Sequence, residues 1–206
     1  MLRIGVPVAL AACLLGTREG AAQAAPQSAT RMASSSLASV EVHVNARKAG
    51  GQWYAEDAGL SGPSRIAITY GQPHARGRRI EGGLIPTDTV WRFGANMATA
   101  LHTDVDLRLG PLTVPAGDYT LFLLNARTGW SLIVSRATAE WGTDYDASRE
   151  FGRVALASRT MAEAEPSLSI YLVPEARPGA ETAELRGVLR IKWGMTELSA
   201  NWQVQP

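Results

Sequence analysis

Apolar and polar residues alternate along the chain from residue 40 onward. Val40, Val42 and Val44 are separated by the polar residues Glu41 and His43. Successive side chains of a β-strand point to opposite faces, so this period of two predicts a strand with one buried face. The same period recurs and predicts further strands at 65–70, with Ile66, Ile68 and Tyr70 facing inward, and at 99–109, 118–124, 130–135, 152–158, 167–173, 185–193 and 197–204.

Residues that favour turns separate these segments. Gly194 predicts a hairpin between 185–193 and 197–204. A helical turn is expected only within 143–151. Short strands with closely spaced turns predict an all-β fold, either an antiparallel β-sandwich or a partly closed barrel, with roughly eight to ten strands and at most one short helix. The other turns are expected at 110–111, 115–118, 125–129, 174 and 178–179.

The first 24 residues have the pattern of an export signal peptide. Arg3 precedes an apolar run at 4–15, and small residues end at Ala24. The run is shorter than the roughly twenty residues of a membrane span. A lipoprotein anchored through Cys13 is the alternative, because residues 10–13 also fit the site at which lipoproteins are cut. We therefore expect an exported protein, periplasmic or secreted, whose only link to a membrane is the signal or a lipid on Cys13.

The remaining sequence predicts a flexible leader at 25–38, rich in Ser and Ala, and a single β domain at 39–206. Hydrophobic residues make up 46% of the chain and charged residues 19%, which suits a globular core. The formal net charge is +1, and loss of Arg3, Arg18 and Glu19 with the signal leaves the charges balanced. That balance argues against nucleic acid as a partner, because binding to phosphates requires many Lys and Arg contacts.

Sequence motifs lie at 69–73, 76–80, 90–99, 114–122, 130–133 and 140–146. Their order and spacing resemble a known exported bacterial family, domain of unknown function 2911 (DUF2911). The resemblance covers about residues 55–205 and implies export and a compact β domain, but no established reaction, substrate or cofactor. It also implies that an Arg and an acidic residue are common in the family where this chain has Gln72 and Met97. A charge pair would then be replaced here by a neutral pair.

The strongest candidate site is the motif segment from Tyr70 through Arg92, together with Asn96. Arginine forks bind carboxylate, sulfate or phosphate, and indole rings stack on sugars or guanidinium groups. The segment could therefore bind an anionic or carbohydrate ligand. The alternative is that Trp91 belongs to the core and Arg92 forms a structural pair. The candidate ligand-binding residues are Tyr70, His74, Arg76, Arg78, Trp91, Arg92 and Asn96, with a second aromatic cluster at Trp141 and Tyr145.

Motifs for common catalytic and metal sites are absent from the sequence. His43, His74 and His102 lack the spacing of zinc ligands. Asp104 with Asp106, and Asp144 with Asp146, lack the remainder of a calcium loop, and a solvated sheet face explains the first pair equally well. The segment at 59–63 fails as a nucleophile elbow because it ends in Pro63. We therefore predict no catalytic residue, metal or cofactor.

These observations favour a non-catalytic binding or envelope-associated module, for which a small anionic or carbohydrate ligand is the candidate partner. A cofactor-free hydrolase or lyase acting on an envelope polymer is the first alternative, since carboxylate pairs leave no local signature. A purely structural domain is the second. The oligomeric state stays open.

Overall fold

The computed structural model describes residues 31–44, 46–49, 52–55, 64–139, 141–175 and 185–205. The predicted signal peptide at 1–24, which includes Cys13, and residues 25–30 of the predicted leader lie outside these residues. Residues 35–38, which were also predicted to be flexible leader, belong to the first strand of the fold. In the part that is described, no helix has the length and apolar character needed to cross a membrane.

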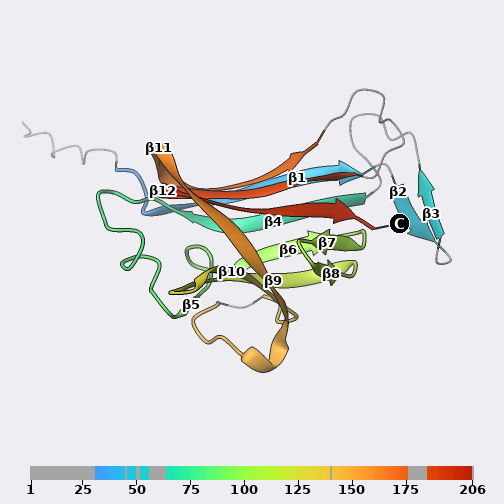
Figure 1. Ribbon diagram of the computed structural model, residues 1–206, viewed down its shortest axis with the longest axis horizontal. Helices are drawn as coiled ribbons and strands as arrows, with labels where there is room; N and C mark the ends of the chain where they lie inside the picture. Colours follow the sequence, from blue (N-terminus) through green and yellow to red (C-terminus); the bar gives the residue numbers. More distant parts are fainter. Residues whose placement is uncertain are drawn as a thin grey trace, which may run out of the picture. The chain divides into compact units, whose positions relative to one another are not determined.

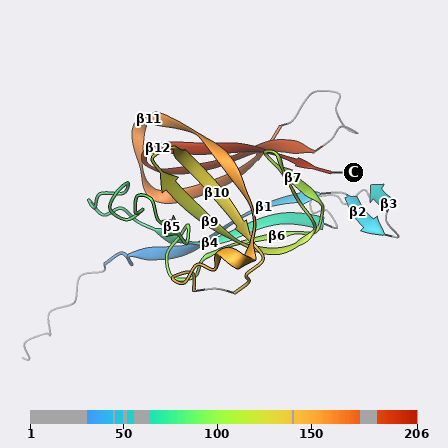
Figure 2. The same ribbon diagram turned by 60° about the horizontal axis from the view of Figure 1, so that its bottom comes forward.

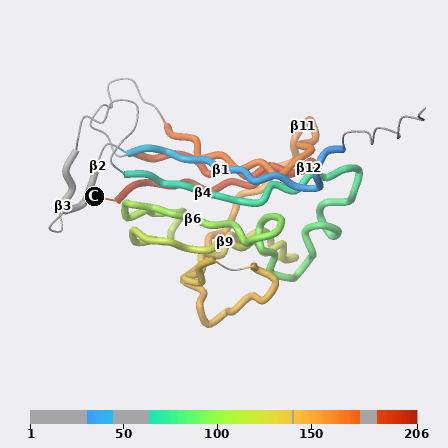
Figure 3. Tube along the Cα trace, turned by 180° about the vertical axis from the view of Figure 1, so that it is seen from behind, coloured from blue at the N-terminus to red at the C-terminus, as the bar shows by residue number. Residues whose placement is uncertain are grey.

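One antiparallel sheet of ten strands makes up most of the fold, so the predicted all-β class is confirmed. The strands follow the order β1-β4-β6-β9-β10-β11-β12-β7-β8, and β5 pairs with β9. This sheet is not closed into a barrel. Figure 1 shows the arrangement, and Figure 3 shows β1, β4, β6 and β9 side by side from behind. The strands are β1 (Ser35–Val44), β4 (Ser64–Pro73), β5 (Val90–Trp91), β6 (Thr99–Thr103), β7 (Leu107–Leu109), β8 (Leu112–Val114), β9 (Gly117–Ala126), β10 (Gly129–Ser135), β11 (Glu150–Pro174) and β12 (Arg186–Val204).

Two small elements complete the described fold. β2 (Ala46–Ala49) and β3 (Gln52–Ala55) form a separate two-stranded sheet. A single turn of 3-10 helix spans Ala147–Arg149, inside the segment where a helical turn was expected. Asp146 caps this turn by accepting hydrogen bonds from the backbone N–H and the hydroxyl of Ser148.

The long strands β11 and β12 differ from the prediction. The sequence indicates two strands in each region, but each region is one continuous strand. Gly194 has a positive φ of 59° and lies within β12, so the predicted hairpin at this residue is wrong. The register between β11 and β12 shifts on both sides of the pair formed by Glu165 and Gly194, and these irregularities absorb the glycine without ending the strand.

β11 also changes partners along its length. Residues 150–156 pair with β10, and residues from 157 onward pair with β12. Figure 2 shows β11 passing from β10 to lie along β12.

A second difference concerns the predicted strand 99–109, which is divided into β6 and β7. The Thr103 hydroxyl donates to the Val105 carbonyl and accepts from the Val105 N–H, which turns the chain between them.

The core contains the residues that the alternation places inward. Ile66, Ile68 and Tyr70 of β4 are buried, as are Val42 and Val44 of β1, which confirms the predicted faces. They join one main cluster with the inward side chains of the other strands.

Three alternate side chains, two at the end of β4 and one on the residue that follows it, bond to β11 almost one hundred residues later. The Ile170 N–H donates to the Tyr70 hydroxyl (3.1 Å), and the Gln72 amide donates to the Leu168 carbonyl (3.0 Å). His74 Nδ1 lies 2.7 Å from the hydroxyl oxygen of Ser167. Because these residues recur at a period of two, all three side chains leave the same face of β4. They hold β11 against the end of β4.

We expect Tyr70→Phe to destabilise the fold by about 1–3 kcal/mol, because the buried Ile170 N–H loses its acceptor. The measurement is the free energy of unfolding in urea. Tyr171→Phe is the matched control, since Tyr171 is 40% exposed on the neighbouring position of β11. Equal unfolding curves for the two variants would show that the Tyr70 contact contributes nothing.

Candidate functional site

The loop 93–96 lies directly against β4, where two glycines permit close contact. A Cβ atom on Gly71 would lie 1.8 Å from the Ala95 carbonyl oxygen, so only glycine fits there. The Ala95 N–H donates to the Gly71 carbonyl (2.9 Å). A Cβ on Gly94 would in turn lie 3.0 Å from the Gly71 oxygen. The close contact between this loop and β4 therefore explains why two positions of the motif segment are glycine.

The same loop contains two residues in the left-handed region of the backbone. Phe93 has a φ of 56° and Asn96 a φ of 64°. Asn tolerates this conformation, but it is uncommon for a bulky residue such as Phe. Burial of the Phe93 ring offsets the cost, and the Thr99 hydroxyl donates to the Phe93 carbonyl at 2.5 Å. Backbone strain of this kind is frequent at ligand sites.

Two tryptophans lie beneath this loop. Trp91 belongs to β5, which pairs with Leu123 and Leu124 of β9. Its ring stacks on Trp193 of β12, with 5.8 Å between centroids and 17° between planes. The Phe93 ring meets it edge-on at 6.2 Å. Trp91 therefore packs against the core, as the alternative interpretation of the sequence holds.

A hollow of about 260 Å³ lies above the tryptophans. Four of the nine candidate residues line it, and no acidic residue does. Its wall also includes the start of β1, where the Asn96 amide donates to the Ser35 hydroxyl (3.3 Å). The lining residues are Ser34, Ser35, Pro73, Arg78, Leu84, Trp91, Arg92, Gly94, Ala95, Asn96 and Trp193.

The two arginines of the hollow differ in their contacts. Arg78 donates to the carbonyl oxygens of His74 (2.7 Å) and Ala75 (3.1 Å), which fixes its guanidinium. Arg92 is partly buried, and its guanidinium carbon lies 6.0 Å from the centre of the Trp141 ring. Among the residues that the structure describes, neither arginine forms an ion pair with a carboxylate. Within the described part of the chain, the lining of the hollow therefore has two cationic groups and no carboxylate.

The second aromatic cluster is divided. Trp141 is 57% exposed and extends beside Arg92. Gly142 allows this, because a Cβ there would lie 2.7 Å from the Arg92 Cβ. Tyr145 instead packs edge-on against Phe122 at 5.1 Å and donates to Glu150. Burial and the bond to Glu150 raise the pKa of Tyr145 to about 12, so its hydroxyl stays protonated as a donor.

The remaining candidates lie outside the hollow. Tyr70 is buried on the β11 side, and burial raises the pKa of its hydroxyl. The His74 ring lies between the hydroxyls of Ser36 (3.1 Å) and Ser167 (2.7 Å). Arg76 is exposed in a turn with a φ of 51°. The Gln72 amide bonds to the Leu168 carbonyl, whereas the Met97 side chain is 44% exposed. The two positions at which the family commonly has a charge pair therefore lie in different surroundings here.

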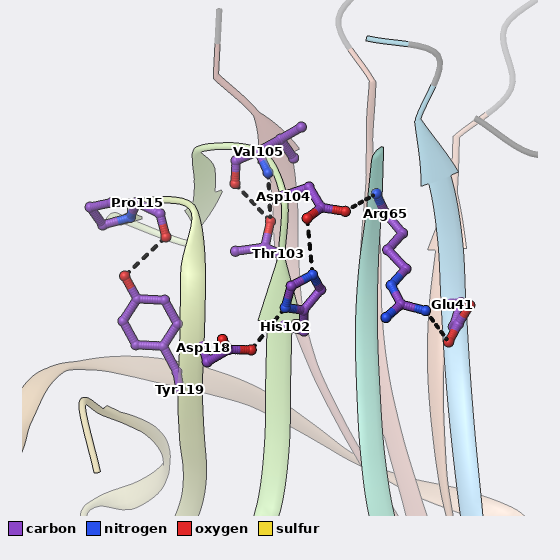
Figure 4. Close-up of polar contacts among 9 residues, drawn as sticks. All are labelled: Glu41, Arg65, His102, Thr103, Asp104, Val105, Pro115, Asp118 and Tyr119. Carbon is purple, nitrogen blue, oxygen red and sulfur yellow. Dashed lines mark hydrogen bonds and ion pairs between the residues drawn. The ribbon is translucent and has the colours of Figure 1, made fainter. Parts of the chain in front are cut away.

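A second polar centre surrounds His102 on β6 (Figure 4). Nδ1 of His102 lies 2.8 Å from Asp118, directly opposite on β9, and Nε2 lies 3.0 Å from Asp104. Asp104 also accepts from the Arg65 N–H of β4 (2.9 Å). The two carboxylates lie on opposite sides of the ring and cannot share one ion with it. Within the described ranges, no three His, Cys, Asp or Glu side chains gather so as to hold a metal.

A third charged cluster is centred on Glu197 of β12, which is 2% exposed. Arg159 and Arg190 bond to its two oxygens at 2.6 and 2.5 Å, and Lys192 lies 3.7 Å away. Burial alone would raise the pKa of Glu197, but the two arginine hydrogen bonds outweigh it and lower that pKa. Because both oxygens are bonded, we interpret this cluster as structural.

The family comparison agrees with the motifs. The model of the family described as "Protein of unknown function (DUF2911)" matches residues 56–201, so the chain belongs to this family. No curated protein and no solved structure matches the chain.

Sequence reasoning missed several residues of these sites. Ser34 and Ser35 were assigned to the leader, and nothing in their sequence indicates a binding wall. Trp193 was placed correctly in a strand, but its partner Trp91 is about one hundred residues away. His102 and Asp104 carry a detectable signal, because residues two apart on a strand share a face. Their partner Asp118 could not be identified from the sequence, because it lies opposite His102 only through the pairing of β6 with β9.

Thr99→Val should destabilise the protein by about 1–2 kcal/mol, because the buried Phe93 carbonyl loses its hydroxyl donor while the shape of the side chain is kept. Urea unfolding measures the loss, and hydrogen exchange at the Ala95 amide should become faster. Thr113→Val, at an exposed position of β8, is the control. If both variants lose the same stability and Ala95 exchange is unchanged, Thr99 does not hold the loop.

Proposed function

We propose that this DUF2911 protein is a non-catalytic binding module, and that the hollow formed by Arg78, Trp91, Arg92 and Asn96 takes a small anionic ligand. The observation that carries the proposal is the pair of arginines in a lining without acidic residues. Guanidinium groups form strong, directional hydrogen bonds with carboxylate, phosphate and sulfate.

The details of the hollow support an anion. Arg78 is held by two carbonyls and is ready to donate with its remaining N–H groups. Arg92 is partly buried, and water is a poorer partner for a charge there than at an open surface. The Ser34 and Ser35 side chains and Asn96 add neutral polar groups. An anion would supply the missing counter-charge.

A neutral sugar has weaker support. Sugar sites commonly offer the open face of an aromatic ring, but one face of Trp91 lies on Trp193 and Phe93 meets its ring edge-on. Trp141 is exposed and could contact an apolar part of a ligand held by Arg92.

A binding role also fits this hollow better than the chemistry of a hydrolase or a lyase. General acid–base catalysis needs a group that exchanges a proton near neutral pH, such as a carboxylate or an imidazole. The described lining residues include neither.

We further propose that the protein is exported, on the evidence of residues 1–24, and acts in the periplasm or outside the cell.

Thermal unfolding with sodium phosphate, sulfate and succinate should test the site, with neutral monosaccharides for comparison and sodium chloride added to equal ionic strength. A bound anion at about one hundred times its dissociation constant adds about 2.7 kcal/mol and raises the midpoint. We expect a shift with at least one of the three anions and none with the sugars.

Arg92→Ala should fold and lose this shift, because no described carboxylate depends on Arg92 for charge balance. Arg127→Ala is the matched control, since the Arg127 side chain is 90% exposed in the β9–β10 turn. The proposal fails if none of the anions raises the midpoint, or if Arg92→Ala keeps the shift. A shift with sugars alone would indicate a carbohydrate site instead.

A further inference from the structure

The His102 centre requires a particular protonation state. Asp118 and Asp104 approach opposite nitrogens of the ring, at 2.8 and 3.0 Å. An ionised carboxylate only accepts hydrogen bonds, so each nitrogen must carry a proton to bond to it. A neutral imidazole has only one N–H. The observed geometry is therefore that of an imidazolium between two carboxylates.

These contacts connect neighbouring strands of the sheet. Asp118 is the residue of β9 directly opposite His102 on β6. Asp104 follows β6 and accepts from the backbone N–H of Arg65 on β4. The Arg65 guanidinium in turn reaches Glu41 on β1 at 3.4 Å. Figure 4 shows this chain of contacts running across the four strands.

The ring is also accessible to protons from solvent. The His102 side chain is 34% exposed, and that of Asp118 is 69% exposed. Both line a hollow of about 310 Å³ on this face. Among the described residues, the charged groups facing this centre are Asp118 from β9, Asp104 after β6, Arg65 from β4, and Glu41 beside His43 on β1.

We propose that His102, Asp104 and Asp118 form a proton-operated clasp. With its proton, the imidazolium fastens β6 to β9 and, through Asp104, to β4. When the proton is lost at higher pH, one ring nitrogen presents a lone pair to a carboxylate, and that contact opens. The centre then carries two negative charges in place of one positive and two negative charges, and the carboxylate of the opened contact is released from the ring.

The direction of the pH dependence follows from the same contacts. The hydrogen bond to Asp118 raises the pKa of His102 above 6.5, burial opposes it, and Asp104 adds to the rise. The folded protein thus binds this proton more tightly than the unfolded chain. The clasp contributes its full stability below about pH 6.5, and the contribution is lost as pH rises through the folded pKa.

The first measurement is a pH titration of the histidine ring nitrogens of the whole chain by NMR, with His102→Gln used to assign the signal. We expect both His102 nitrogens to be protonated at pH 6.5, with titration above that value. A neutral His102 ring at pH 6.5 would overturn the proposal, and the titration itself is followed on the wild-type protein.

The second measurement compares urea unfolding of the wild type and Asp118→Asn from pH 5.5 to 9. Asn keeps the shape but removes the negative charge, so the His102 midpoint should fall and the stability gap between the two proteins should narrow as pH rises. His43→Gln is the matched control, because it removes a histidine of the same sheet and leaves the contacts of His102 with Asp104 and Asp118 in place, so the narrowing gap to Asp118→Asn should be kept on this background. A gap that does not change with pH would contradict the clasp.

Discussion

The bonds from β4 to β11 are the contacts on which the rest of the structure depends. Tyr70, Gln72 and His74 reach Ile170, Leu168 and Ser167 across 93–100 residues of sequence. Closing such a long loop costs entropy, and the cost is recovered only when several contacts form together. These side-chain bonds extend the short backbone pairing of the two segments, in which His74 bridges Ser167 and the Ala75 N–H donates to the Pro166 carbonyl. They hold β11 in place while it changes partner from β10 to β12, without closing the sheet into a barrel.

The hollow takes its shape from the same strand. Gly71 lies between Tyr70 and Gln72 on β4, and its side faces the loop 93–96. One face of β4 packs against β11. Because Gly71 has no side chain, the Ala95 peptide can lie directly against the β4 backbone there. That contact brings Arg92 and Asn96 to the mouth of the hollow, and Trp91 is fixed by Trp193 below. Backbone and ring packing thus positions Arg92, while the His74 and Ala75 carbonyls hold the guanidinium of Arg78.

The sequence predicts the strands and their buried faces well, because a period of two is local information. It does not predict which strands run on. Gly194 favours a turn in isolation, yet its φ of 59° is accommodated within β12 because β11 adjusts its register opposite it. The candidate site is predicted in part for the same reason. Arg78, Trp91, Arg92 and Asn96 share one short segment, whereas Ser35 and Trp193 come from distant strands that only folding brings there.

The hollow with Arg78 and Arg92 and the His102 centre use charge in opposite ways. A guanidinium keeps its charge throughout the pH range in which proteins fold, so a hollow built on Arg78 and Arg92 holds a constant positive charge. The His102 hollow contains an imidazolium, whose charge changes near neutrality. Both centres adjoin β6, since Thr99 at its start holds the Phe93 carbonyl and His102 lies three residues further on. Under the two proposals, a change of pH would act on one end of this strand through a proton, while an anion would act near the other end through fixed charges.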